Sequence, residues 1–247
     1  MRVSIEVCVG SVAEGDVAWS FGVESVEACS WLAVGGVTPS LGLVRQLAVP
    51  GGPSIRVLVR PGPGAFTVDD GALRTMKEDV GVLSKDGSAS GVVLGVLNAE
   101  GLPDVERSYA IMACAGSLEV TFHRAIDRNT DIRRAFGSIC DLGIHRVLTS
   151  GGSSLAKDGM ATIAWMVQNA PKGMIICAAG GITPTNVVEV VERTGVSEVH
   201  FAAQRVVHDP VPVVKLSSTG ASNEFSLLPD PAKIEGVLQA LSKAGLR

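Results

Sequence analysis

The chain has 247 residues, of which 46% are apolar and only 4% aromatic, and it carries a net charge of −4 at pH 7. This length can bury a large core, so neither disulfides nor metals are needed for folding. The negative charge and the absence of any Lys/Arg run argue against nucleic acid or an anionic membrane as a partner, because both attract basic surfaces.

The location of the protein follows from its apolar segments and its cysteines. The first apolar stretch is short and is interrupted by Glu6, so we expect no signal peptide. No apolar run approaches the roughly 18 residues of a membrane span. The five cysteines form no CxxC motif and no Cys/His ladder, which is typical of reduced thiols. We therefore predict a cytoplasmic protein.

Short Val- and Ile-rich segments recur along the chain and predict eight strands. In chain order these strands span Val3–Val9, Ser25–Cys29, Ile55–Arg60, Gly91–Leu97, Leu118–His123, His145–Thr149, Met174–Ala179 and Ser197–Ala202. Helical periodicity lies between them, for example over Asp69–Lys85, Ile132–Leu142 and Asn186–Arg193. Eight strand–helix units of about 30 residues predict an α/β fold, a single (β/α)8 TIM barrel over residues 1–247 with the repeats in residues 1–202.

Local signals mark helix starts and one long loop. Thr38-Pro39, Thr183-Pro184 and Asp230-Pro231 each place a capping oxygen before a proline, and the last predicts a C-terminal helix over 230–245. Residues 203–229 read as a long loop after the eighth strand that could fold over the mouth of the barrel as a lid. The alternative fold is an open doubly wound sheet. Because no G-x-G-x-x-G follows the first strand, we expect no nucleotide cofactor.

Alternation along the predicted strands sends charged side chains toward the barrel axis. Five of them should form one mutually satisfied polar cluster: Glu6, Glu27, Arg60, His123 and His200. Those late in their strands, and so nearest the carboxyl-end face of the barrel, are Glu27, Cys29, Arg60, His123 and His200. Arg56, Glu119 and Glu198 lie early in their strands and are predicted to form structural salt bridges at the bottom. The residues late in their strands could instead form a buried ionic network that only orients the strands. We favour a functional site, because the carboxyl ends of barrel strands usually carry the active site.

Several ordered motifs carry a family resemblance. They read Ile5-Glu6-Val7-Cys8, Val26-Glu27-Ala28-Cys29-Ser30, Gly35-Gly36-Val37-Thr38-Pro39-Ser40, Val59-Arg60-Pro61, Val120-Thr121-Phe122-His123-Arg124-Ala125, Arg146-Val147-Leu148-Thr149-Ser150-Gly151-Gly152, Ala179-Gly180-Gly181-Ile182-Thr183 and Glu198-Val199-His200. From about residue 3 to residue 205 this series resembles the CutC family of copper homeostasis proteins. The resemblance implies a (β/α)8 barrel in the cytosol, often oligomeric, with a role in copper handling. The sequence departs from the family pattern at Gly10, Gly62, Ala65 and Ala202, all expected at the mouth.

Copper binding is the first functional hypothesis. Cu(I) prefers thiolate ligands, and Cys8 and Cys29 both point inward near the ends of neighbouring strands. Strands about 4.8 Å apart allow two such sulfurs to share one ion, so Cys8 and Cys29 are the predicted metal ligands. The alternative is that each is a small buried apolar residue, and we expect Cys114, Cys140 and Cys177 to be core residues.

An acid–base enzyme is the alternative function. Its candidate residues at the mouth are Glu6, Glu27, Arg60, His123, Arg124 and His200. A carboxylate would serve as base, His123 as acid or electrophile, and Arg60 as a clamp for a carboxylate- or sugar-like substrate. Gly180 and Gly181 follow the seventh strand, where this fold commonly binds phosphate, although the pair also suits a tight turn.

A binding or scaffold protein without turnover is the third hypothesis. The mean hydropathy of +0.33 suggests that a partner subunit covers part of the helix surface, so we expect a homo-oligomer. The expected ligand is a copper ion or a small polar molecule.

Overall fold

A closed barrel of parallel strands forms the centre of the computed structural model, which describes residues 2–208 and 225–247. The barrel strands are β1 (Ser4–Val9), β2 (Ser25–Ala28), β3 (Ser54–Leu58), β4 (Gly91–Leu94), β5 (Glu119–Phe122), β6 (Arg146–Thr149), β7 (Ile175–Ala179) and β8 (Glu198–Ala202). Each strand pairs with the next in parallel, and β1 also pairs with β8. The predicted (β/α)8 TIM barrel is confirmed, and the open doubly wound sheet is excluded because the barrel has no free edge.

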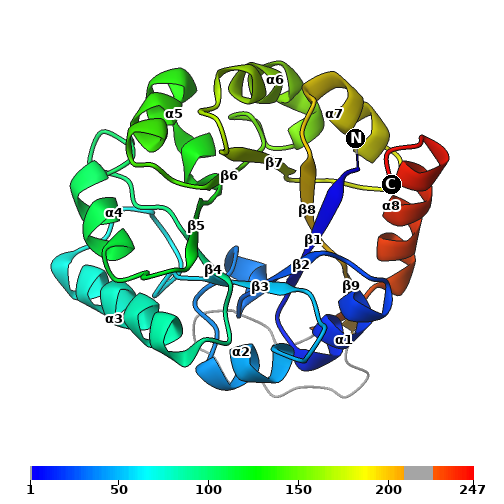
Figure 1. Cartoon of the computed structure of the whole chain (residues 1–247), viewed down its shortest axis with the longest axis horizontal. Helices are drawn as coiled ribbons and strands as arrows, with labels where there is room; N and C mark the ends of the chain where they lie inside the picture. Colours follow the sequence, from blue (N-terminus) through cyan, green and yellow to red (C-terminus); the bar gives the residue numbers. More distant parts are fainter. Residues whose placement is uncertain (1, 209–224) are drawn as a thin grey trace.

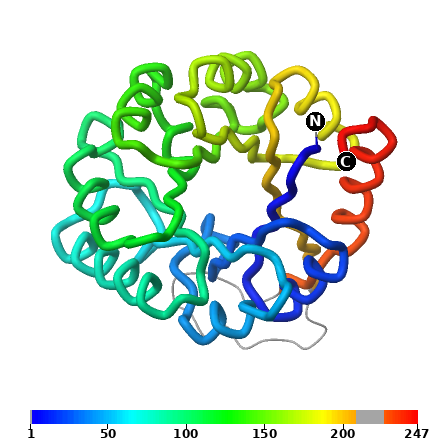
Figure 2. Tube along the Cα trace, viewed as in Figure 1, coloured from blue at the N-terminus to red at the C-terminus, as the bar shows by residue number. Residues whose placement is uncertain are grey.

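The helices form a ring around the barrel, as Figure 1 shows in a view along its axis. They are α1 (Val12–Ser20), α2 (Leu41–Leu47), α3 (Asp70–Asp86), α4 (Val105–Met112), α5 (Ile132–Asp141), α6 (Met160–Asn169), α7 (Val187–Thr194) and α8 (Pro231–Lys243). The last helix lies beside the first strand (Figure 2), where Val3 N donates to Leu246 O over 2.8 Å. In the part of the chain that the structure describes, no helix combines the length and apolarity that a bilayer crossing needs.

The barrel strands alternate between two faces as their sequences predict. Val3, Ile5 and Val7 belong to the large apolar core between strands and helices. Cys8 and Cys29 instead join Leu58 and Val93 in a small apolar cluster inside the barrel. Because side chains alternate along a strand, the same parity carries Glu6 and Glu27 to the interior, where both are buried.

One of the three predicted helix caps is confirmed and two are wrong. Asp230 caps α8 as expected, with proline at the first helical turn. Thr38 does not cap α2, because its hydroxyl accepts a hydrogen bond from Arg60 N at 2.8 Å while Ser40 caps the helix. Thr183 does not cap α7 either, because its hydroxyl pairs with that of Thr185 and a turn precedes the helix. In both cases a nearby polar partner competes for the side-chain oxygen.

The segment after β8 is more regular than the predicted loop. Its two ends form an antiparallel pair, β9 (Gln204–His208) and β10 (Phe225–Pro229). Two valines in β9 and two leucines in β10 favour strands over an irregular loop. Gln204 Nε2 donates to Glu14 Oε2 on α1 over 2.7 Å, which ties the pair to the rim beside β1. The middle of the predicted lid, residues 209–224, lies outside the described residues.

Candidate functional site

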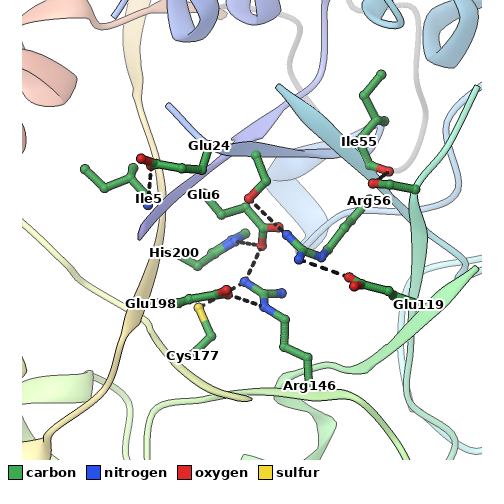
Figure 3. Close-up of polar contacts among 12 residues, drawn as sticks. Ile5, Glu6, Glu24, Ile55, Arg56, Glu119, Arg146, Cys177, Glu198 and His200 are labelled. Atoms are coloured by element: carbon green, nitrogen blue, oxygen red, sulfur yellow. Dashed lines mark hydrogen bonds and ion pairs between the residues drawn. The ribbon is translucent and has the colours of Figure 1, made fainter. Parts of the chain in front are cut away.

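A buried ionic network centred on Glu6 fills the lower barrel (Figure 3). The Glu6 carboxylate accepts hydrogen bonds from Arg56 Nη1 and from Arg146 Nη2, each over 2.9 Å. His200 Nδ1 lies 2.9 Å from Glu6 Oε1. Arg146 also donates to Glu198 over 2.7 Å, so the network joins β1, β3, β6 and β8.

Charge pairing keeps Glu6 ionised although it is buried. Burial alone would raise the pKa of Glu6, but Arg146, His200 and Arg56 hold it well below its usual value. Arg56 reaches Glu119 over 3.3 Å, which provides the salt bridge expected at the bottom of the barrel. The sequence reasoning missed Arg146 as an inward residue. Alternation within the predicted strand His145–Thr149 was the available signal.

A pocket of about 190 Å³ lies above this network, at the carboxyl ends of the strands, and we call it the mouth pocket. Its polar lining consists of Cys8, Glu27, Cys29, Arg60, His123, Arg124 and His200. Its apolar lining includes Leu32, Leu58, Phe66 and Leu148. All the predicted site residues except Glu6, Gly180 and Gly181 therefore line one pocket.

One wall of the mouth pocket holds two thiols and a carboxylate. Cys8 Sγ and Cys29 Sγ are 2.9 Å apart, and both cysteines are free and buried. The strand register places Cys8 opposite Glu27, whose Oε1 is 3.8 Å from Cys8 Sγ. Cys8, Glu27 and His200 each offer one ligand atom, and these atoms lie within 4.8 Å of one another. The wall is thus rich in atoms that bind metal ions.

The ionisation of this wall is shifted toward neutral forms. The hydrogen bond with Cys29 and burial raise the pKa of Cys8 well above its usual value. Burial also raises the pKa of Glu27, and the nearby Glu6 carboxylate adds to this effect. Glu27 Oε2 is buried without a hydrogen-bond partner in the described part of the chain. A cation or a ligand donor would therefore find an acceptor that the protein itself leaves unused.

Arg60 and His123 line the opposite side of the mouth pocket. Arg60 donates to the carbonyls of Val34, Gly36 and Gly64 and lies 5.0 Å above the ring of Phe66. His123 Nδ1 accepts the backbone N–H of Ala125 over 3.2 Å. Neither side chain contacts a carboxylate of the inner network.

The expected cluster of Glu6, Glu27, Arg60, His123 and His200 is found only in part, because these residues do not satisfy one another. His200 contacts Glu6 in the lower network and also lines the mouth pocket with Glu27, Arg60 and His123, whereas Glu6 does not line that pocket. Arg60 and His123 follow the last residues of β3 and β5, so they emerge above the layer that contains Glu6. Backbone carbonyls and a backbone amide satisfy them there, which sequence alternation alone does not reveal.

Burial makes His123 a source of acid sensitivity. Burial lowers the pKa of His123 from 6.5 to about 4, so the folded protein holds a neutral ring with its proton on Nε2. Unfolded His123 binds a proton below about pH 6.5, and stability from this group is therefore present above that pH and is lost as the pH falls toward 4. Between about pH 7.5 and about pH 5 the loss should be about 2 kcal/mol.

His123→Asn tests this assignment. At about pH 7.5 we expect the variant to lose less than about 1.5 kcal/mol of unfolding free energy, because Asn can still accept the Ala125 amide. At about pH 5 the variant should equal or exceed the parent, since it lacks the titrating ring. Urea unfolding at the two pH values measures both differences. A variant that loses the same stability on acidification as the parent would contradict the role of His123.

Arg124 lies at the rim with a carboxylate that the sequence reasoning missed. Asp127 accepts hydrogen bonds from Arg124 Nε over 3.0 Å, from Thr149 Oγ1 over 2.6 Å and from Ser150 N over 2.9 Å. This carboxylate ties the segment after β5 to the loop after β6. An Asp three residues after an Arg, as in Arg124 and Asp127, was the available signal.

The predicted glycine pair forms a turn beneath Arg124. Gly180 and Gly181 have φ values of 98° and 68°, which only glycine adopts readily. A Cβ on Gly180 would lie 3.0 Å from the Arg124 guanidinium carbon, so the glycine also allows this close approach. The role of the pair as an anion site stays a prediction.

The four positions expected to depart from the family pattern lie at or near the mouth. Ala202 lines the mouth pocket, and Gly62 and Ala65 line a neighbouring cavity beneath Arg60. Gly10 N donates to Glu14 Oε2 over 2.7 Å at the first turn after β1.

Comparison with known proteins identifies the family. The model of the CutC family matches residues 3–205. The CutC family protein of Aliivibrio fischeri strain MJ11 is 34% identical over 247 residues, which covers 98% of this chain and 100% of that protein. A human protein named copper homeostasis protein cutC homolog is 36% identical over 200 residues, which covers 81% of this chain and 73% of that protein.

A solved structure supports the same conclusion. The CutC protein from Streptococcus agalactiae superimposes with a TM-score of 0.75 at 28% identity and covers 81% of this chain and 98% of its own. The matched span begins at the first barrel strand and ends just after the eighth, so it includes every predicted site residue. The chain therefore belongs to the CutC family, whose members include proteins named for copper homeostasis.

Proposed function

We propose that this protein binds Cu(I) in the mouth pocket through Cys8 and Cys29 and serves in copper homeostasis. The observation that carries the proposal is the pair of free sulfurs, 2.9 Å apart in the wall of the pocket. Cu(I) prefers thiolate ligands, and two of them from rigid neighbouring strands suit its low coordination number. The name of the human relative points to the same metal.

The surroundings of the two thiols fit a monovalent soft cation. When both sulfurs are thiolates, a bound Cu(I) leaves one net negative charge. Glu27, whose pKa burial raises, can hold a proton there and so avoid a second negative charge beside the thiolates. Cys177 is less suited to bind Cu(I) than Cys8 or Cys29, because its sulfur lies in the lower network, 3.1 Å from the cationic Arg146 Nη2.

The pH dependence of binding tests the proposal. The raised pKa of Cys8 means that this thiol is protonated near neutral pH, so a metal must displace at least one proton. Below the raised pKa, affinity should increase by at least about tenfold for each unit of rising pH. Anaerobic titration with a chromogenic Cu(I) chelator as competitor, calibrated at each pH, measures the slope. Absence of tight binding, or an affinity that does not change with pH, would contradict binding by these thiols.

A further inference from the structure

We propose that the mouth pocket also binds a small hydroxy acid, with its carboxylate against Arg60 and its hydroxyl against Glu27. This ligand site goes beyond the proposed copper site, because its charged group is held by Arg60 on the other side of the pocket, and it shares only Glu27 with the wall that holds the thiols. Three observations carry it: an arginine without a counter-ion, a buried carboxylate oxygen without a donor, and a pocket that connects them.

Arg60 differs from the other arginines of the barrel interior and mouth. Arg56, Arg124 and Arg146 each pair with a carboxylate within 3.3 Å. Arg60 has only neutral partners among the described residues, namely three backbone carbonyls. An anion at this guanidinium would supply the missing negative charge.

The free donors of Arg60 suit a carboxylate. Of its five N–H groups, Nη1 uses two on Val34 O and Gly36 O, and Nη2 uses one on Gly64 O. Nε–H has no acceptor in the described part of the chain but is itself buried, so the N–H that can meet a ligand is the one left on Nη2. This donor, together with the charge of the guanidinium group, can hold a carboxylate oxygen. The ring of Phe66 supports the guanidinium from one face.

The rest of the ligand would meet an acceptor on the thiol wall and a second donor on the side of Arg60. Glu27 lines the pocket and its Oε2 has no partner, but this oxygen is buried, so the carboxyl accepts a ligand hydroxyl once it turns toward the pocket. His123 remains neutral, since burial lowers its pKa to about 4, and Ala125 N occupies Nδ1, so Nε2–H is the donor that remains. A ligand hydroxyl next to a carboxylate can donate to Glu27, and the ligand oxygens can accept from His123 Nε2–H.

The dimensions of the pocket limit the ligand. A volume of about 190 Å³ holds a compact acid of roughly three to five carbons and is too small for a nucleotide. The lining of the pocket also contains apolar side chains, namely Leu32, Leu58 and Phe66. The site should therefore favour a short hydroxy acid such as malate over a sugar with many hydroxyl groups.

Calorimetric titration of the whole chain with malate, succinate and glycerol tests the inference. Malate should bind, succinate should bind about tenfold more weakly because it lacks the hydroxyl, and glycerol should not bind because it lacks the carboxylate. Arg60→Met should weaken malate binding by at least about tenfold, whereas Arg74→Met on the exposed face of α3 should leave it unchanged. Glu27→Met should remove the preference for malate over succinate.

The metal-free protein and a further variant separate this site from copper binding and from misfolding. Malate binding is measured on the metal-free protein with both thiols in place, so a failure of the copper proposal does not affect this one. Arg60→Lys retains the charge but loses the planar guanidinium group with its Nη2 donor, and it should show an intermediate loss if Arg60→Met fails to fold. Failure of the parent to bind malate or succinate, or equal binding by the parent and the folded Arg60 variant, would overturn the inference.

Discussion

Replacing Glu6 by glutamine is expected to lower the free energy of unfolding by about 3–5 kcal/mol. The Glu6 side chain is 1% exposed and accepts hydrogen bonds from Arg56 and Arg146, the latter 2% exposed. Glutamine removes the shared negative charge and offers one acceptor instead of two. The two guanidinium groups then repel each other across a region from which water is excluded, with only Glu119 and Glu198 left to balance them. Chemical denaturation measures the loss, with an unchanged denaturant slope as the sign of two-state unfolding.

Glu119→Gln provides a matched control for this prediction. Glu119 belongs to the same network and binds Arg56 over 3.3 Å, but its side chain is 55% exposed. Water screens that pair, so its loss should change stability by no more than about 1 kcal/mol. If Glu6→Gln were no more destabilising than Glu119→Gln, the lower network would not be the structural element described above.

Much of the fold follows from the spacing of its strands. Eight Val-rich segments at regular intervals specify the barrel, and alternation within them correctly directs Ile5 outward and Glu6 inward. The same alternation, with the pairing of neighbouring strands, brings Cys8 near Cys29. These features depend on the backbone repeat of a strand, which a sequence displays directly.

The composition of the polar clusters could not be predicted in the same way. Alternation gives the direction of a side chain but not its height in the barrel, so Glu6 and Arg60 were placed together although one lies in the lower network and the other at the rim. Arg60 finds its partners in loop carbonyls, and Asp127 finds its partners in the loop after β6. Such contacts depend on loop paths, which no periodic pattern encodes. The pairing of β9 with β10 is a separate case, because the Val and Leu residues of these segments favour strands but do not specify which strands pair.

The second large effect concerns copper. A variant that carries both Cys8→Ser and Cys29→Ser is expected to lose more than about a hundredfold in Cu(I) affinity, because it lacks both soft ligands. Mutation of a group that only contacts a metal ligand typically lowers metal affinity by ten- to about a hundredfold, so loss of the ligands themselves should cost more. Serine preserves the size of each side chain, so the barrel should remain folded. Alanine at both positions serves as a second variant if the buried hydroxyls destabilise the protein.

Cys114→Ser with Cys140→Ser is the matched control. It also removes two thiols, but both are half-buried and neither lines the mouth pocket. The control should bind Cu(I) as tightly as the parent. A loss of affinity in the control would indicate that copper binds to thiols in general and not to the paired sulfurs.

The most direct test of the copper site is an anaerobic competition titration of Cu(I) against a chromogenic chelator, carried out side by side on the parent, the Cys8/Cys29 variant and the Cys114/Cys140 control. One tightly bound Cu(I) per chain is expected in the parent and in the control, with a loss of more than about a hundredfold in affinity in the Cys8/Cys29 variant. Equal Cu(I) affinity in the parent and in a folded Cys8/Cys29 variant would contradict binding by these two thiols.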